Sequence, residues 1–378
     1  MNPKDGFYLF VFSLNSKIVE FKNFEEFNKK FSLGKKDLIL TNEFIYNPYL
    51  KKYNLECSVI FQEKHGNGEP TDTMIDAILK DTADKDIERV IAIGGGTVID
   101  ISKIIILKNS GISADLFMKK IDIVKEKELV VIPTTCGTGS EVTNISIAFL
   151  EKENIKMGLA APELYPDYAV LIPEFLETLP YKFFCTSSID ALVHATESYL
   201  SPKATVYSEM FSEKAIELLI NGFKYIAENG EESRKNKLIE FLQGSNFAGI
   251  AFGNAGCAAV HALSYPLGGR YHIPHGESNQ LVFISVFKKY KEKQPNGKIE
   301  KLEVFLGEKL GARKEDSLNA LETLLEKVYP KKKLEEYGIE KESYREFAKE
   351  VLEKQQRLLA NNYVELTEDE IVAVYENI

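Results

Sequence analysis

The sequence predicts an α/β domain over residues 1–182, followed by an all-helical domain over residues 183–378. Three observations support this division. A chain of 378 residues is longer than one hydrophobic core usually serves, which favours two domains. Short apolar runs alternate with helical patterns up to about residue 180, as in the βαβ units of a parallel sheet. Strand-like runs nearly vanish beyond Pro180, so we expect two domains with a ligand-binding cleft between them.

The apolar run at residues 6–14 is the first expected strand. A secretory leader is the alternative, but Asp5 precedes the run and no small-residue cleavage site follows it. Further strands are expected at residues 37–42, 57–62, 89–96, 128–135 and 168–173, with helices at 69–84 and 97–110. In the second half, helical patterns cover residues 187–200, 207–230 and 234–263. Proline and glycine disfavour helix, so the helix should end before Pro266, Gly268, Gly269 and Pro274.

The composition excludes several kinds of partner. A net charge of -10 disfavours the neutralisation of many phosphates, so nucleic acid is not expected to bind. No apolar run approaches the length of a membrane-spanning helix. The four cysteines lack CxxC spacing and are expected to be buried, reduced thiols. These features predict a soluble, cytoplasmic protein whose partner is a small molecule.

Two loops rich in glycine and threonine follow predicted strands. In "VIAIGGGTVIDISK" (90–103), three glycines lead into a helix beginning near Thr97, whose free N–H groups and dipole favour a pyrophosphate. The spacing is not the GxGxxG fingerprint, and such a turn by itself is more often a plain turn than a cofactor site. The segment "IPTTCGTGSEVTN" (132–144) supplies hydroxyls after the next strand. Because ligands bind at the carboxyl ends of parallel strands, the two loops together favour a nucleotide site.

Four residues of the second half form a candidate metal site. Asp190 and His194 are four positions apart on a predicted helix, so both side chains project from one face. His261 and His275 flank the segment in which the chain should turn back, and the segment 261–276 holds three of the five histidines. One carboxylate and three imidazoles suit Fe(II), Zn(II), Mn(II) or Co(II), and ligand type does not decide among them. The alternative is a set of hydrogen-bonded core histidines.

These motifs identify a resemblance to a known family. The segments "GGGTVIDISK", "PTTCGTGSEVT" and "DALVH", with the spacing of His261 and His275, resemble the iron-dependent (group III) alcohol dehydrogenases in order and over nearly the full length. In finer detail "FQEKHGNGEP", "GSNFAGIAFGNAG", "HALSYPLGG" and "QQRLLANNY" are similar to the 4-hydroxybutyrate dehydrogenases. The resemblance implies a Rossmann-like N-terminal domain and a helical C-terminal domain, the dehydroquinate synthase-like fold of iron-containing alcohol dehydrogenases.

The resemblance also implies a ligand set and a cofactor site. Fe(II), or Zn(II) in its place, would be held by Asp190, His194, His261 and His275. The pyrophosphate of NAD would lie on Gly95, Gly96 and Thr97, and threonines of the second loop would line its adenine and ribose. The implied cofactor-binding residues are Asn42, Gly95, Gly96, Thr97, Asp100, Thr134, Thr135, Thr138, Lys156 and Leu179.

Three positions depart from the family pattern or have no assigned role. Where many members have a histidine assigned to proton transfer, this chain has Tyr265, and His272 is the alternative relay. At Asn42 relatives often have an aspartate that selects NAD, so discrimination against NADP should be weaker here. Arg270 is a candidate for holding a substrate carboxylate, although a solvated loop arginine is the simpler expectation.

The expected reaction is the NAD-dependent interconversion of 4-hydroxybutyrate and succinate semialdehyde by hydride transfer. The main alternative changes the substrate to a neutral short-chain alcohol or diol, such as butanol or 1,3-propanediol. A lyase of the dehydroquinate synthase type is more remote, because no cluster of lysine and arginine near the histidines offers a sugar-phosphate site. A metal- or nucleotide-binding module without activity is the non-enzymatic alternative. We expect a homo-oligomer, a dimer.

Overall fold

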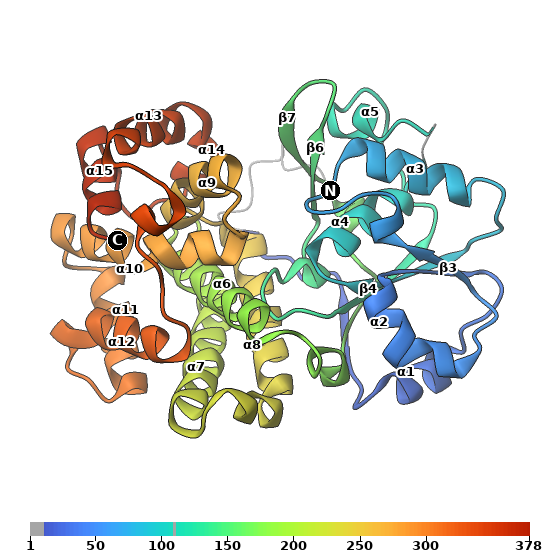
Figure 1. Ribbon diagram of the computed structural model, residues 1–378, viewed down its shortest axis with the longest axis horizontal. Coiled ribbons are helices and arrows are strands. Elements are labelled where there is room, and N and C mark those ends of the chain that lie inside the picture. Colours follow the sequence, from blue (N-terminus) through green and yellow to red (C-terminus); the bar gives the residue numbers. More distant parts are fainter. Residues whose placement is uncertain (1–10, 109–110) are drawn as a thin grey trace. The chain divides into compact units, whose positions relative to one another are not determined.

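A six-stranded parallel sheet forms the centre of the α/β unit (Figure 1). The structure is a computed structural model that describes residues 11–108 and 111–378. Along the sheet, the strands are β1 (Lys17–Glu20), β8 (Tyr168–Leu171), β5 (Glu128–Pro133), β4 (Arg89–Gly94), β2 (Asp37–Thr41) and β3 (Ser58–Phe61). All neighbouring pairs are parallel, which confirms the predicted sheet.

The central strands of this sheet, β2, β4 and β5, are buried on both faces. In β2, Leu38 and Leu40 join one apolar core, whereas Ile39, between them, joins a second core. The first core contains α3 (Asp72–Thr82), α4 (Gly96–Ile105) and α5 (Ser113–Phe117), and the second contains α1 (Phe24–Phe31) and the short α2 (Glu43–Ile45). Because consecutive strand residues point to opposite faces, a strand buried on both needs apolar residues throughout. The five strands predicted from residue 37 onwards are all present.

The beginning of the chain and one hairpin differ from the expectation. Of the strand expected at residues 6–14, residues 6–10 lie outside the described part, and residues 11–14 form no strand. The observed edge strand β1 is instead largely exposed, so its sequence "KIVE" carries no continuous apolar run. An antiparallel hairpin of β6 (Ile145–Leu150) and β7 (Ile155–Ala160) was not predicted, because β7 is mostly exposed.

The second unit is built from helices alone within the described residues, as predicted (Figure 1). Its α-helices are α6 (Tyr181–Leu200), α7 (Val206–Asn229), α9 (Ala259–Tyr271), α10 (His275–Lys293), α11 (Lys298–Leu310), α12 (Ser317–Val328), α13 (Tyr344–Lys354), α14 (Gln356–Leu359) and α15 (Glu368–Glu376). The helix α8 (Leu238–Ala255) is divided, because only its residues from Ile250 onwards belong to this unit. The chain passes between the two units at 14/15, 184/185, 234/235 and 249/250. Residues 235–249 group with the α/β unit, and the described residues up to Leu14 group with the helical unit.

The helical pattern at 234–263 and the helix end expected after it both need correction. The chain bends by 105° between α8 and α9, where Gly256 has a φ of 82°. The helix α9 then continues through Pro266, Gly268 and Gly269, so the expectation that these residues end it is wrong. Proline removes one hydrogen bond, and burial of a large part of α9 outweighs that loss. The helix ends at His272, whose left-handed conformation allows the chain to turn back.

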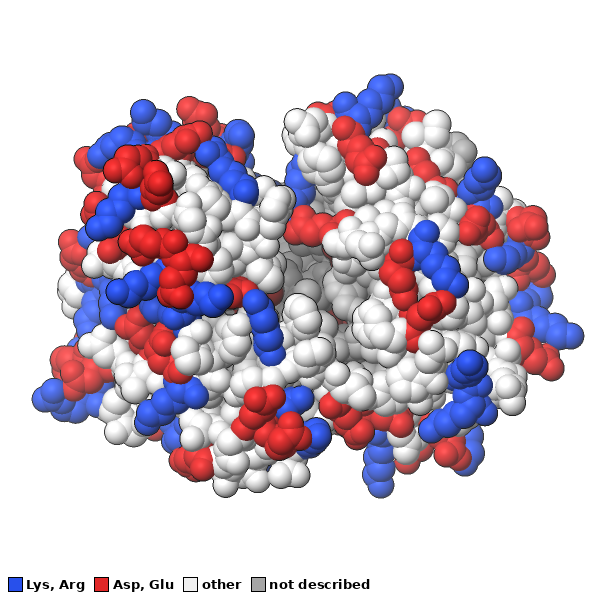
Figure 2. All heavy atoms as spheres, in the orientation of Figure 1, with Lys and Arg blue, Asp and Glu red and all other residues white. Residues whose placement is uncertain are grey.

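Charged side chains of both signs lie on the surface (Figure 2), and the cysteines are buried. On the face drawn in Figure 2, lysine and arginine are interspersed with aspartate and glutamate, and no broad basic field is present there. All four cysteines are buried, and none of them forms a disulfide bond. No single helix of the described chain has the length and hydropathy to span a membrane; α8 and α9 reach these values only as a bent pair.

Candidate functional site

The four predicted metal ligands gather in the helical unit. Asp190 lies at the centre: one carboxylate oxygen is 3.6 Å from His261 Nε2 and 3.7 Å from His275 Nε2, and the other is 4.0 Å from His194 Nδ1. Asp190, His194 and His261 are buried, whereas the side chain of His275 is 41% exposed. Three of the four side chains are therefore shielded from solvent, and His275 is the exposed one.

Gly276 allows the elements that carry these ligands to approach. It follows His275 in the first turn of α10, and a Cβ added to it would lie 2.2 Å from the carbonyl oxygen of Thr186 on α6. Any side chain at position 276 would therefore separate α10 from α6. The close packing at Gly276 thus lets His275, the residue before it, bring its Nε2 to 3.7 Å from a carboxylate oxygen of Asp190.

The donor set fits a divalent metal ion. One donor atom from each of Asp190, His261 and His275 lies within 4.8 Å of the others. Burial alone would raise the pKa of Asp190, but the neighbouring imidazoles outweigh burial and lower it, so the carboxylate stays ionised. His261 Nε2 is buried and has no hydrogen-bond partner among the described residues. A buried nitrogen without a partner is costly, and a metal ion at this position would remove that cost.

Three neighbours of the predicted ligands, Glu197, Cys257 and Asn279, were not assigned a role from the sequence. Glu197 accepts a hydrogen bond from His261 Nδ1 at 2.7 Å. Its position three residues after His194 on a predicted helix was the available signal. Cys257 was expected only as a buried thiol, yet its sulfur lies within 4.8 Å of a donor atom of both His194 and His261. Asn279 donates to Asp190 Oδ1 at 2.6 Å and thereby orients the central carboxylate.

The two candidate proton relays differ in their position. The ring centroids of Tyr265 and His275 are 6.5 Å apart, and Tyr265 is half-buried. His272 is exposed and occupies the left-handed position that ends α9. The geometry favours Tyr265. Arg270 also lies at the surface, where it forms ion pairs with Glu346, at 2.9 Å, and with Glu350.

In the α/β unit, the two glycine and threonine loops lie against each other. Gly95 precedes α4 and Gly96 begins it, and no side chain caps this helix end. A Cβ at Gly95 would lie 3.6 Å from the Thr135 side chain, and one at Gly96 would lie 3.2 Å from that of Thr138. The free N–H groups at this helix end form a site of the kind that binds phosphate.

A buried ionic network joins these loops. The Lys103 ammonium on α4 donates to Ser140 Oγ at 2.7 Å, to Thr143 Oγ1 at 3.1 Å and to the carbonyl of Ile145 at 2.7 Å. Ser140 Oγ in turn donates to Asp100 at 2.8 Å. Burial lowers the pKa of Lys103 to about 8, although Asp100 partly opposes the shift. Burial raises the pKa of Asp100. Its second carboxylate oxygen accepts from the backbone N–H of Ile147 at 3.1 Å, so Asp100 joins α4 both to the second loop and to β6.

The other implied cofactor residues also lie in the α/β unit. Thr134 follows β5 and Asn42 follows β2, so both stand with the glycine turn at the carboxyl ends of adjacent strands. Asn42 donates to a carboxylate oxygen of Glu63 at 2.8 Å, which the sequence had not linked to it. Lys156 on β7 forms an ion pair with Glu69 at 2.7 Å. Leu179 lies three residues after the 3₁₀ segment Pro173–Leu176, and its backbone N–H donates to the carbonyl of Leu176.

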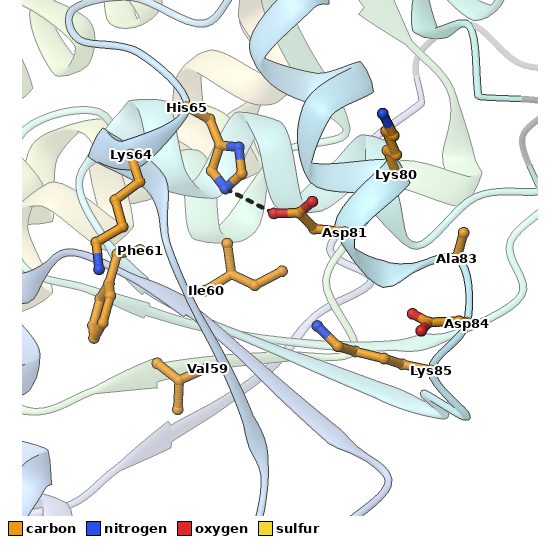
Figure 3. Close-up of a pocket in the computed structure, with 10 residues that line it drawn as sticks. All are labelled: Val59, Ile60, Phe61, Lys64, His65, Lys80, Asp81, Ala83, Asp84 and Lys85. Carbon is orange, nitrogen blue, oxygen red and sulfur yellow. Dashed lines mark ion pairs between the residues drawn. The ribbon is translucent and has the colours of Figure 1, made fainter.

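A separate pocket of about 640 Å³ lies beside the edge strand β3 (Figure 3). His65 and Asp81 face each other across it, with His65 Nε2 3.5 Å from a carboxylate oxygen of Asp81. Lys80 and Lys85 supply further charge from the end of α3 and the turn after it. None of the residues predicted as functional lines this pocket.

Comparisons with known proteins agree along the whole chain. Residues 17–173 match the family model described as iron-containing alcohol dehydrogenase, and residues 184–378 match the C-terminal model of the Fe-containing alcohol dehydrogenase family. The chain is 52% identical to 4-hydroxybutyrate dehydrogenase of Clostridium kluyveri, over 97% of this chain and 99% of that protein. It is 34% identical to long-chain-alcohol dehydrogenase 1 of Geobacillus thermodenitrificans, over 76% and 74%. Among solved structures, the fold is similar to that of sulfoacetaldehyde reductase from Bifidobacterium kashiwanohense, which was solved in complex with NAD+. The TM-score is 0.86 and the sequence identity 22%, over 98% of both chains.

Proposed function

The chain belongs to the iron-containing alcohol dehydrogenase family, and we propose that it interconverts 4-hydroxybutyrate and succinate semialdehyde with NAD as hydride carrier. The family membership confirms the resemblance found in the sequence. One observation of the site carries the assignment to metal-dependent chemistry, namely the buried carboxylate of Asp190 among three imidazoles, one of which has an unpartnered nitrogen. The substrate follows from the 52% identity to a 4-hydroxybutyrate dehydrogenase.

The residues of the site have distinct tasks in this reaction. Bound Fe(II) would act as a Lewis acid on the alcohol or aldehyde oxygen and lower the pKa of the alcohol. Asp190, His194, His261 and His275 would hold the ion. The exposed side chain of His275 leaves room for a small alcohol, while the buried ligands exclude water from the other sides. Gly95, Gly96 and the threonines of the second loop would hold the NAD pyrophosphate and ribose.

A direct assay tests the proposal. The protein is loaded with Fe(II) without oxygen and supplied with NADH and succinate semialdehyde, beside a panel of plain aldehydes such as butanal. We expect NADH absorbance to fall fastest with succinate semialdehyde, and a chelator to abolish the change. A higher kcat/KM for butanal or 3-hydroxypropanal would favour the dehydrogenase of a neutral alcohol or diol. An absence of net NADH change with every aldehyde would contradict the dehydrogenase and favour a lyase or a binding module.

Tyr265 is the proposed proton relay. Replacing Tyr265 with phenylalanine is expected to lower kcat about tenfold or more, because a positioned acid or base contributes up to about 10²–10⁴ in rate. The same change at the exposed His272 should leave kcat nearly unchanged. The measurement is the pH profile of kcat for both variants. Slow turnover in His272→Phe alone would reverse the assignment, and full activity in both variants would exclude a relay by either side chain.

The carboxylate of Glu63 is proposed to support NAD selection. Asn42 lacks the negative charge that repels the 2′-phosphate of NADP in many relatives. Its side-chain amide nitrogen, however, donates to a carboxylate oxygen of Glu63 at 2.8 Å and so places a negative charge beside it. Glu63→Gln is therefore expected to raise kcat/KM for NADP about tenfold relative to NAD, since one like-charge repulsion of about 1 kcal/mol or more is removed. The comparison of both cofactors in wild type, Glu63→Gln and the exposed control Glu56→Gln measures this. An unchanged cofactor ratio would contradict the role of Glu63.

Arg270 is not expected to hold the substrate carboxylate. Glu346 and Glu350 already compensate its charge. Arg270→Ala is accordingly expected to leave KM for 4-hydroxybutyrate within about twofold of wild type, because exposed ion pairs contribute about 0–1 kcal/mol. A large rise in KM, with KM for butanol unchanged, would restore the role.

We further propose a cytoplasmic location and a homodimer. The four cysteines are buried and form no disulfide bond, which supports a reducing compartment. Exposed apolar side chains at the start of α7 (Val206, Tyr207 and Met210) offer a surface for association. Light scattering on the purified protein measures its mass, and a monomer at micromolar concentration would exclude the dimer.

A further inference from the structure

Glu197 is the most completely engaged buried carboxylate near the metal ligands. It lies on α6, three residues after His194, and its side chain is 0% exposed. Three N–H groups donate to it: the backbone of Ala258 at 2.9 Å, the backbone of Val260 at 2.5 Å and Nδ1 of His261 at 2.7 Å. All three donors lie within four consecutive residues at the start of α9.

The first consequence concerns the start of α9. The N-cap residue is Ala258, which has no side chain that could accept from the helix N–H groups. Glu197 supplies this acceptor from another helix, and a carboxylate at a helix N-terminus is also favoured by the helix dipole. The buried charge is thus compensated by hydrogen bonds, and the helix that carries His261 is fixed to the helix that carries Asp190 and His194.

The second consequence concerns the protons of His261. An ionised carboxylate accepts but cannot donate, so Nδ1 of His261 must carry the proton in this contact. In a neutral imidazole the other nitrogen, Nε2, then bears the lone pair. That atom is the buried nitrogen without a hydrogen-bond partner, and it faces Asp190 at 3.6 Å.

We propose that Glu197 is a positioning residue of the metal centre, which fixes the orientation and tautomer of His261 so that Nε2 binds the metal ion. The inference rests on the metal site of the proposed function. It adds to that site a residue that touches neither the metal nor the substrate and acts only through His261 and the start of α9.

The test measures metal affinity in Glu197→Gln. Glutamine has a similar shape but offers an amide N–H as well as an oxygen, so it accepts either tautomer of His261. Competition with a chromophoric chelator for Zn(II) should show a 10- to 100-fold weaker affinity than wild type, the usual effect of losing a partner of a metal-binding histidine. In the Zn(II)-loaded wild type, ¹⁵N NMR should show a slowly exchanging N–H on His261 Nδ1, which Glu197→Gln loses or exchanges faster. Glu197→Asp retains the charge and should recover part of the affinity.

Glu303→Gln is the matched control. Glu303 is an equally buried glutamate of the helical unit, paired with Lys291. Its replacement should leave Zn(II) affinity unchanged, even where it lowers the melting temperature. The inference is overturned when Glu197→Gln binds Zn(II) within twofold of wild type, or when wild-type His261 carries its proton on Nε2. A wild type that binds metal but shows no dehydrogenase turnover would instead overturn the proposed function and leave the role of Glu197 standing.

Discussion

Replacing Asp190 with alanine is expected to abolish stoichiometric Fe(II) binding and to lower kcat/KM about 10³-fold or more. One or other oxygen of this carboxylate lies within 4.0 Å of a nitrogen of each of the three histidines, so its loss removes the centre of the site. A metal acting as a Lewis acid lowers the free energy of the transition state by several kcal/mol, and each 1.36 kcal/mol changes the rate about tenfold. Metal content after anaerobic loading and desalting, together with steady-state kinetics, measures both effects.

Two further variants separate charge from folding. Asp190→Asn keeps the shape of the side chain and its contact with Asn279, so a similar loss of metal would be due to the charge. Asp316→Ala removes a half-exposed aspartate of the same unit and should retain full metal content and activity. One bound Fe(II) per chain in Asp190→Ala, with wild-type affinity, would show that the metal site lies elsewhere.

Replacing Lys103 with methionine is expected to lower the free energy of unfolding of the α/β unit by about 3–5 kcal/mol, the usual cost of breaking a buried ionic network from one side. The variant loses three hydrogen bonds and leaves Asp100 buried without its nearby cation. Affinity for NAD should fall as well, since Lys103 joins α4 to the second loop. Chemical denaturation at pH 7 and NAD titration measure the two effects, with the exposed Lys30→Met as control. Wild-type stability in Lys103→Met would exclude this role.

The lowered pKa of Lys103 is expected to make the stability of the folded protein depend on pH. Its pKa is about 8 in the folded protein, against an ordinary value of 10.5. Between these values the unfolded chain binds more protons than the folded protein, so this group increases stability as the pH rises from about 8 to 10.5. Below about pH 8 both states are protonated, and the full cost of burying the charge remains. Lys103→Met should lack this rise, and its persistence in the variant would assign the rise to other groups.

The strands that are buried on both faces could be predicted from the sequence. The central strands β2, β4 and β5 lie between two cores, and their continuous apolar runs are visible in the sequence. The edge strand β1 and the strand β7 are mostly exposed, so their sequences carry no such signal. The assignment of residues 235–249 to the α/β unit arises from contacts between segments far apart in the chain, which periodicity does not report.

The candidate ligands that lie on one helix could be predicted from the sequence. Asp190 and His194 share a helix face, and helical spacing alone places them together. The approach of His261 to His275 instead depends on α9 continuing through Pro266 and turning only at His272, which local propensity argued against. Glu197 was missed for a related reason. Its partners are N–H groups at the start of another helix, and no side-chain pattern identifies them.

The close approach at Gly276 restricts how this enzyme can vary during evolution. Every substitution at that codon that changes the amino acid adds at least one carbon atom where the backbone of Thr186 already lies. A Cβ added at Gly269, seven positions earlier, would meet no atom within 4 Å, so this position can accept other residues. Position 276 should therefore be as invariant among functional descendants as the ligand His275 beside it, although it offers no chemical group. Selection for a metal centre can thus act on a residue whose contribution is the absence of a side chain.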